Sequence, residues 1–326
     1  MRFPSMYLLL ALLPALAGCY FAKLAGLQLG LINRQRQLAP ALRDEPDAER
    51  RRLLALVPEL RAFARNVMQL RPGKNYTGYY ATEQKGIVFI LSASAKTRLE
   101  PYTFWFPVVG SVPYKSFVDE ADAEEQEREL QGAGYDTWLG RAKAYSTLGF
   151  FRDPITTVMM RKGTVRFVEV LLHEMAHARH YVPGQTEWNE QLASLVGIEG
   201  TNHFLRSHYG HDPALIAELE QHVERTRVRE AAVERTLALA ERLYASGKPD
   251  AVVLREREPL FERLRAELVA LDPEQDHSEL VVNNARLLQY KRYLAGGDRV
   301  TALWTDARGS WVRFWQLAEA HAESLD

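Results

Sequence analysis

Residues 168–197 read VEVLLHEMAHARHYVPGQTEWNEQLASLVG, and this stretch combines apolar residues typical of a buried helix with histidine and glutamate residues. Its first half carries apolar residues around most of a helix circumference, so this helix is expected to be buried. Two histidines and a glutamate nevertheless lie within it. Because an unpaired buried polar group costs about 1–3 kcal/mol, these side chains need partners, and one metal ion would partner all of them.

His173, Glu174 and His177 form an H-E-x-x-H motif. A spacing of four residues places both imidazoles on one face of a helix, one turn apart, where they can bind the same ion. Glu174 points beside that face, where it can reach a water molecule on the metal rather than the metal itself. The motif predicts a zinc site with one ion per chain and with His173 and His177 as two of its ligands.

A catalytic zinc ion needs a third protein ligand. The metzincin pattern would place a glycine at position 180 and a histidine at 183, but the sequence has His180 and Pro183, which excludes that class. His180 lies near the end of the predicted helix, where a cationic side chain suits the helix dipole. A structural or solvated role is therefore expected for His180.

The third ligand is expected on a second helix, which begins after the loop at 183–186. A stripe of one carboxylate and three small residues follows that loop at positions i, i+3, i+4 and i+7: Glu190, Ala193, Ser194 and Gly197. Small residues let two helices approach closely, which would bring Glu190 to the seam between them. Glu190 is the predicted ligand, with Glu199 and Glu187 as alternatives.

Several neighbouring residues are expected to support the chemistry. Asn189 and Ser194 can orient a ligand imidazole or carboxylate. An oxyanion formed during hydrolysis needs a hydrogen-bond donor opposite the metal, and tyrosine can supply it. Tyr145 is the first candidate, followed by Tyr114 and Tyr181.

The composition describes an ordinary globular protein with no nucleic-acid partner. Of the 326 residues, 25% are charged and 47% are hydrophobic, and the formal net charge is −1. The sequence has no cluster of lysine and arginine interleaved with aromatic residues. Binding to nucleic acid is therefore not expected.

The N-terminus has the layout of a secretory signal. Residues 1–18 contain one early arginine, then an apolar run and small residues just before the sole cysteine, Cys19, and are expected to be the signal peptide. The sequence Leu16-Ala17-Gly18-Cys19 resembles a bacterial lipobox, which predicts lipidation of Cys19 and a membrane anchor in the bacterial cell envelope, facing the periplasm. Tyr20 replaces the aspartate often linked to inner-membrane retention, which favours the outer membrane. A plain signal peptide followed by a free cysteine is the alternative.

The periodicity of the chain predicts an α+β fold that is predominantly helical. Residues 19–80 are expected to form a helical lead-in, which Pro58 kinks or divides. Residues 81–200 are expected to form the catalytic core, with two or three strands at 86–110, an edge strand at 155–160 and both site helices. Residues 201–326 are expected to be a helical C-terminal region.

The sequence resembles the gluzincin metallopeptidases, and more closely a bacterial family of zinc aminopeptidases, many of them predicted lipoproteins. The segments that carry this resemblance include residues 105–110, 144–149, the H-E-x-x-H motif, Asn189-Glu190 and Asn283-Asn284-Ala285. The resemblance implies a zincin-like core with a small mixed sheet beside the H-E-x-x-H helix. In that family an Asn-Glu pair follows the H-E-x-x-H motif at the same distance as Asn189-Glu190 does here, which supports Glu190 as the third ligand.

The resemblance also implies peptide-bond hydrolysis, with Glu174 as general base on a zinc-bound water and a peptide or protein as substrate. Gluzincin aminopeptidases hold the substrate amine with acidic residues, often on a Gly-x-Met-Glu-Asn strand, and no such segment occurs here. Hydrolysis is therefore better supported than removal of N-terminal residues. Two alternatives are a non-catalytic envelope lipoprotein with a structural zinc site and a chaperone-like quality-control protein. Glu174 argues against a purely structural site, which would have four closed ligands.

Overall fold

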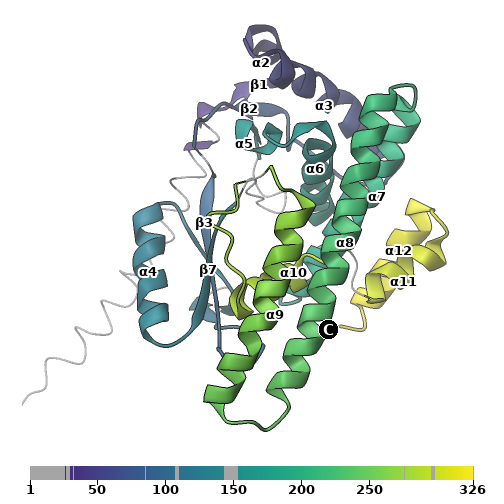
Figure 1. Ribbon diagram of the computed structural model, residues 1–326. Helices are drawn as coiled ribbons and strands as arrows, with labels where there is room; N and C mark the ends of the chain where they lie inside the picture. The colour runs from purple at the N-terminus through teal and green to yellow at the C-terminus, as the bar shows by residue number, and fades with distance from the viewer. Residues whose placement is uncertain are drawn as a thin grey trace, which may run out of the picture.

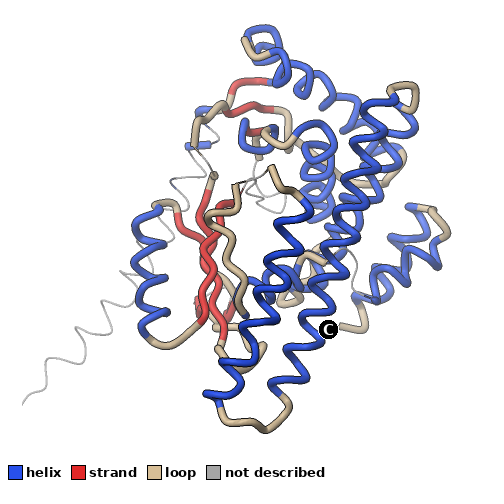
Figure 2. Tube along the Cα trace, viewed as in Figure 1, coloured by secondary structure: helices blue, strands red, loops and turns tan. Residues whose placement is uncertain are grey.

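The computed structural model describes residues 26, 30–31, 33–84, 86–106, 110–142, 153–274, 276–294 and 298–325. The predicted α+β, predominantly helical fold is confirmed (Figures 1 and 2). None of the helices in these ranges combines the length and the apolarity that a membrane span requires. Cys19 and Tyr145 lie outside the described residues.

The helices account for most of the described chain. In order, they are α2 (Leu38–Asp44), α3 (Ala48–Asn66), α4 (Glu120–Gly132), α5 (Thr157–Met160), α6 (Gly163–Arg179), α7 (Thr186–Tyr209), α8 (Pro213–Tyr244), α9 (Asp250–Leu271), α10 (Asn284–Arg292), α11 (Asp298–Ala307) and α12 (Trp311–Ala322).

The described strands form three small sheets. Their bounds are β1 (Arg36–Gln37), β2 (Gly78–Tyr80), β3 (Val88–Ser94), β4 (Phe104–Phe106), β5 (Gly110–Val112), β6 (Lys115–Phe117), β7 (Asp136–Ala142) and β8 (Ile155–Thr156). The longest strands belong to the antiparallel sheet β6–β3–β7. The sheet β1–β2–β8 is mixed, because β1 is antiparallel and β8 parallel to β2, and β4 pairs with β5.

The β6–β3–β7 sheet has two different faces. Successive side chains of a strand point to opposite sides. Leu91 and Ala93 pack in one apolar cluster with Ala123 of α4, whereas Ile90 of the same strand lines a cavity on the other side. In Figure 1, α4 flanks β3 and β7 on one side and the α8–α9 pair lies on the other. The sheet is thus the wall between a small core and the cavity.

Helices α6 and α7 pack at unusually short range. Leu171, Leu172 and Met175 of α6 are fully buried in the main core, as the apolar circumference of this helix predicts. At the crossing, a Cβ placed on Gly197 of α7 would lie 3.1 Å from the carbonyl oxygen of Glu169 and 3.3 Å from Cβ of His173. The small residues predicted on α7 therefore allow the two helices to touch at the level of His173.

Helix α10 is fastened to the sheet by two adjacent amides. Asn283 caps α10 by accepting a hydrogen bond from the backbone N–H of Arg286 and donates to the carbonyl of Thr137. Asn284 is fully buried and donates to the carbonyls of Ala95, Lys96 and Arg98. These contacts hold α10 against the strands β3 and β7.

A buried ion pair ties the α8–α9 pair to the same place. Arg257 of α9 binds both carboxylate oxygens of Asp136 at 2.7 and 3.1 Å. Asp136 also accepts from the backbone N–H of Asn284 at 3.1 Å. Bidentate arginine–carboxylate pairs of this kind fix orientation as well as distance. The start of β7, α9 and α10 is therefore one rigid junction.

Two local expectations are corrected or refined by the structure. Pro58 does not divide its helix, since α3 runs without a break from residue 48 to 66. The predicted edge strand at 155–160 is a strand only at Ile155–Thr156 and continues as α5. Helix α7 also passes through residue 200, where the sequence places a boundary between regions. The division into regions remains a prediction.

Replacing Gly197 by alanine tests the close approach of α6 and α7. The new methyl group would contact backbone oxygen and His173 Cβ, so α7 must shift by a few tenths of an ångström. We expect affinity for the predicted zinc ion to fall about 10–100-fold, as when a metal ligand loses its positioning contacts. Gly132→Ala, with open space around it, is the control. Unchanged affinity in Gly197→Ala would show that this contact does not position the ligands.

Replacing Asn284 by alanine tests the junction beneath α10. The substitution leaves the carbonyl oxygens of Ala95, Lys96 and Arg98 and the hydroxyl of Tyr244 without this partner. We expect the free energy of unfolding, measured by urea titration, to fall by about 2–4 kcal/mol. Asn66→Ala, at an exposed amide, should change it by less than about 0.5 kcal/mol. Equal effects of both variants would contradict the role given to Asn284.

Candidate metal centre

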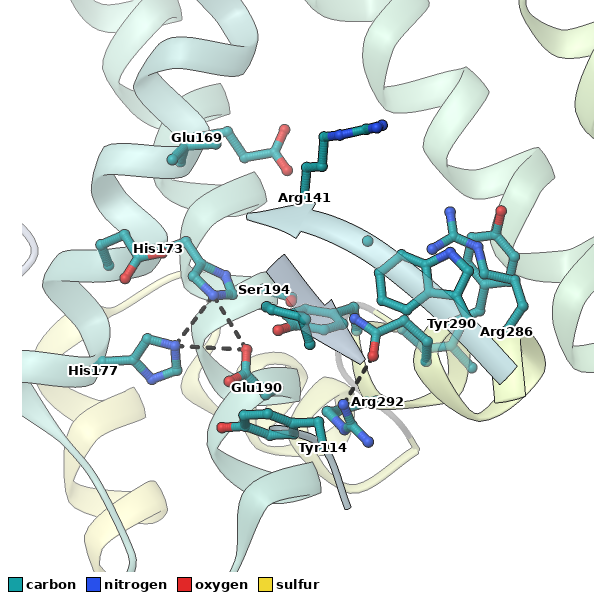
Figure 3. A pocket seen from close by; sticks show the side chains of 18 of the residues that line it. Tyr114, Arg141, Glu169, His173, His177, Glu190, Ser194, Arg286, Tyr290 and Arg292 are labelled. Carbon is teal, nitrogen blue, oxygen red and sulfur yellow. Dashed lines mark hydrogen bonds and ion pairs between the residues drawn. The ribbon is translucent and has the colours of Figure 1, made fainter. Parts of the chain in front are cut away.

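Three side chains from two helices converge on one point. His173 and His177 project from α6, and Glu190 projects from the first turns of α7 (Figure 3). The Nε2 atoms of the two histidines are 3.2 Å apart. Oε2 of Glu190 lies 3.4 Å from Nε2 of His173 and 3.6 Å from Nε2 of His177. These are the three residues that the sequence singles out as ligands.

The spacing of these atoms fits a tetrahedral ion. Ligand atoms held ~2.0–2.1 Å from zinc at tetrahedral angles are separated by ~3.3–3.4 Å. Oε2 of Glu190 is also buried with no hydrogen-bond partner in the described chain, a costly state for a carboxylate. The structure therefore brings together two imidazoles and a carboxylate that could hold one metal ion.

The electrostatics of the cluster keep Glu190 ionised. Burial alone would raise the pKa of Glu190, but its contacts with His173 and His177 outweigh burial and hold the pKa well below its usual value. Burial lowers the pKa of His177, and the Glu190 carboxylate reverses this and raises it. An ionised carboxylate is the form that binds a cation.

The loop between α6 and α7 is held by Asn189. Its amide donates to the carbonyl of Val182 at 2.7 Å and accepts from the N–H of Val182 at 2.8 Å. Asn189 is predicted to orient a ligand imidazole or carboxylate, and that role stays a prediction. Through these two hydrogen bonds Asn189 braces the loop that leads into α7. Ser194, one helical turn after Glu190, lines the adjoining cavity.

The other residues considered as ligands lie elsewhere. Glu187 is exposed and accepts a hydrogen bond from Gln191. Glu199 lies beside a separate hollow, and burial raises the pKa of its carboxyl. His180 accepts a hydrogen bond from the indole N–H of Trp188 at 3.3 Å and does not join the cluster. These positions leave Glu190 as the carboxylate that reaches both histidines.

The cluster opens into a cavity of about 580 Å³. One wall is the free face of the β6–β3–β7 sheet, and the others come from α6, α7, α8 and α10. Glu174, the expected general base, lines this cavity. Tyr114 and Tyr181 line it as well, whereas Tyr145 lies outside the described residues.

One wall of the cavity comes from a helix that sequence reasoning did not assign to the site. Helix α10 and the residue that caps its end turn a polar and aromatic stripe toward the cavity: Arg286, Gln289, Tyr290 and Tyr293. These residues follow one another at i, i+3, i+4 and i+7, which is a helix face. That periodicity, beside the Asn283-Asn284 pair, was a signal in the sequence, but only the fold shows that the stripe faces His173.

The phenol ring of Tyr293 stacks on the imidazole of His173. Its ring centroid is 6.2 Å from that of His173, with 28° between the ring planes. Burial of its hydroxyl end, together with the charge of Glu190, raises the pKa of Tyr293 well above its usual value, although 37% of the residue is exposed. The hydroxyl therefore stays protonated and can donate a hydrogen bond.

Glu169 is occupied by structural partners, one turn before His173. Its carboxylate forms ion pairs with Arg166 and His222. Burial favours the neutral acid, but Arg166 and His222 outweigh burial and lower the pKa of Glu169 to about 2. This network joins α6 to α8 at the rim of the cavity and leaves Glu169 ionised at neutral pH.

The comparisons with known proteins give one family and no individual relative. Neither the curated proteins nor the solved structures contain a match to this chain. A family model with the description "Putative aminopeptidase" matches residues 19–325, which is nearly the whole sequence. The match includes α6, α7 and α10, the helices that build the cluster and the cavity. The chain therefore belongs to this aminopeptidase family.

Proposed function

We propose that the protein is a zinc-dependent peptidase. The observation that supports this most directly is the convergence of His173, His177 and Glu190 at 3.2–3.6 Å, at the edge of a cavity that Glu174 also lines. The family description points to peptide-bond hydrolysis. Two imidazoles and one carboxylate are the ligand set of several zinc peptidases, which keep a fourth position open.

The roles of the side chains follow from their positions. A zinc ion at such a site polarises a carbonyl group and makes a water molecule more acidic. Glu174 is next to His173 in the sequence and lines the cavity, so it acts as the base that accepts the proton of the attacking water. It then delivers that proton to the leaving amine. Tyr293, Tyr114 and Tyr181 border the same cavity as donors for the oxyanion.

Metal content and activity should respond differently to two substitutions. We expect about one zinc ion per wild-type chain, and its loss in Glu190→Ala, because two histidines alone do not complete the site. Glu174→Gln should retain zinc while kcat falls about 10²–10⁴-fold, the usual contribution of a general base. Elemental analysis and hydrolysis of a peptide library measure the two properties. Glu187→Ala, an exposed carboxylate on α7, is the matched control.

Two results would contradict this assignment. Zinc retained in Glu190→Ala would mean that another group completes the site. Undiminished hydrolysis in zinc-loaded Glu174→Gln would remove Glu174 from the mechanism and favour a structural ion.

We also propose that the chain is anchored in the bacterial envelope by a lipid on Cys19 and faces the periplasm. The support is the sequence Leu16-Ala17-Gly18-Cys19 after an apolar run. One acyl chain gives marginal membrane binding, and two or more give a stable anchor.

Labelling with radioactive palmitate tests the anchor. We expect label in the wild-type chain and in Gly18→Ala, which keeps a small residue before the cysteine, but none in Cys19→Ser. Separation of inner and outer membranes then locates the labelled chain, and we expect it in the outer membrane. Label that persists in Cys19→Ser would contradict lipidation at this residue.

A further inference from the structure

Arg286 is held in the cavity wall by aromatic rings rather than by an acid. Its guanidinium carbon lies 4.4 Å from the ring centroid of Trp138 on β7 and 4.2 Å from that of Tyr290 on α10. Its backbone N–H is fixed by the cap residue Asn283 at 3.0 Å. Stacking between two rings restricts the planar group to one orientation before any ligand arrives.

The guanidinium of Arg286 has unused hydrogen-bonding capacity. Its Nε atom is buried and has no hydrogen-bond partner in the described chain. Among the described residues, no carboxylate forms an ion pair with Arg286. An arginine has five N–H donors, and a buried donor without an acceptor costs about 1–3 kcal/mol. An acceptor supplied by a ligand would remove that cost.

Two other arginines of the cavity are paired with acids of the protein. Arg141 forms ion pairs with Glu120 and Glu279, each at 2.7 Å. Arg166 pairs with Glu169. Arg286 lines the same cavity, but unlike these two arginines it has no paired acid among the described residues. Arg292, which also lines the cavity, donates a hydrogen bond to Gln289 at 2.8 Å and lies over the ring of Tyr114.

A second guanidinium reinforces the positive potential beside Arg286. Arg229 of α8 lines the same cavity and lies within electrostatic reach of Tyr290. Burial, together with the charge of Arg166, lowers the pKa of Arg229. A positive potential that is strong enough to act on a neighbouring arginine also attracts an anion.

The acidic groups of the cavity are committed elsewhere. Glu190 belongs to the ligand cluster, Glu174 is the proposed base, and Glu169 binds Arg166 and His222. Glu230 lies within electrostatic reach of Arg229. A substrate ammonium would therefore find its attractive groups already engaged, whereas a substrate carboxylate would find Arg286.

We propose that the cavity selects peptides that carry a carboxylate, and that Arg286, stacked between Trp138 and Tyr290, binds this group while the scissile bond lies at the His173–His177–Glu190 cluster. The carboxylate can be the C-terminus of the peptide or the side chain of an aspartate or glutamate. In Figure 3, Arg286 and Tyr290 lie on one side of the view and the three clustered residues lie on the other. This inference deepens the proposed peptidase function and rests on it.

Three tetra-alanine-based peptides separate the two sources of the carboxylate. The first has a free C-terminus, the second has a C-terminal amide and one glutamate, and the third has a C-terminal amide and no acidic side chain. Binding is measured by calorimetry to the full zinc-loaded chain carrying Glu174→Gln, in mild detergent, and hydrolysis is measured with the unsubstituted chain. We expect at least one carboxylate peptide to bind about tenfold or more tightly than the third.

Substitutions at Arg286 connect this preference to the residue. Arg286→Met should abolish the preference, and Arg286→Lys, which keeps the charge without the planar fork, should retain part of it. Arg141→Gln, whose guanidinium is paired with Glu120 and Glu279, is the matched control and should retain all of it. Zinc content and thermal unfolding show whether each variant is folded. The higher-affinity carboxylate peptide identifies the C-terminus or the side chain as the group recognised.

The outcomes separate this inference from the proposed function. Equal binding of all three peptides, or a preference that persists in Arg286→Met, would overturn carboxylate recognition even if every peptide is hydrolysed. If none of the peptides is hydrolysed but the binding preference is lost in Arg286→Met, recognition by Arg286 would be supported. The proposed peptidase function would then be contradicted.

Discussion

The contact between α6 and α7 at Gly197 is the constraint on which the site depends. Two histidines on one helix can present only two ligand atoms, and the third must arrive from a neighbouring helix at van der Waals range. Gly197 permits that range because it has no side chain to separate α7 from Glu169 and His173. Glu190, two helical turns earlier on α7, then reaches both imidazoles.

A second junction decides what faces the cluster across the cavity. Arg257, Asp136 and Asn284 link α9, β7 and α10 through buried hydrogen bonds. Breaking a buried ion pair by removing one partner costs about 3–5 kcal/mol, so this junction resists local rearrangement. It holds the α10 stripe, with Arg286 and Tyr293, against the free face of the sheet. The His173–His177–Glu190 cluster and the α10 wall of the cavity are thus supported by separate parts of the core.

The amount of the site that the sequence predicts depends on how local each contact is. The H-E-x-x-H spacing fixes His173 and His177 on one helix face, because a helix repeats every ~3.6 residues whatever surrounds it. Glu190 follows from the same periodicity applied to the next helix. The sequence predicts that Asn189 orients a ligand side chain, but not that its amide pairs with both backbone groups of Val182. Hydrogen bonds to backbone groups of a loop leave no periodic signal in a sequence.

The sequence alone determined the predominantly helical class, the buried helix that carries His173, Glu174 and His177, and the stripe of small residues that lets α7 pack closely against that helix. These properties depend on residues within a few turns of each other. Only the tertiary structure decided that α10, more than a hundred residues after His173, forms the opposite wall and stacks Arg286 between Trp138 and Tyr290. Such placement results from non-local packing at the Asp136–Arg257–Asn284 junction. A long-range contact of this kind depends on the whole core and is not encoded by the spacing of any one segment.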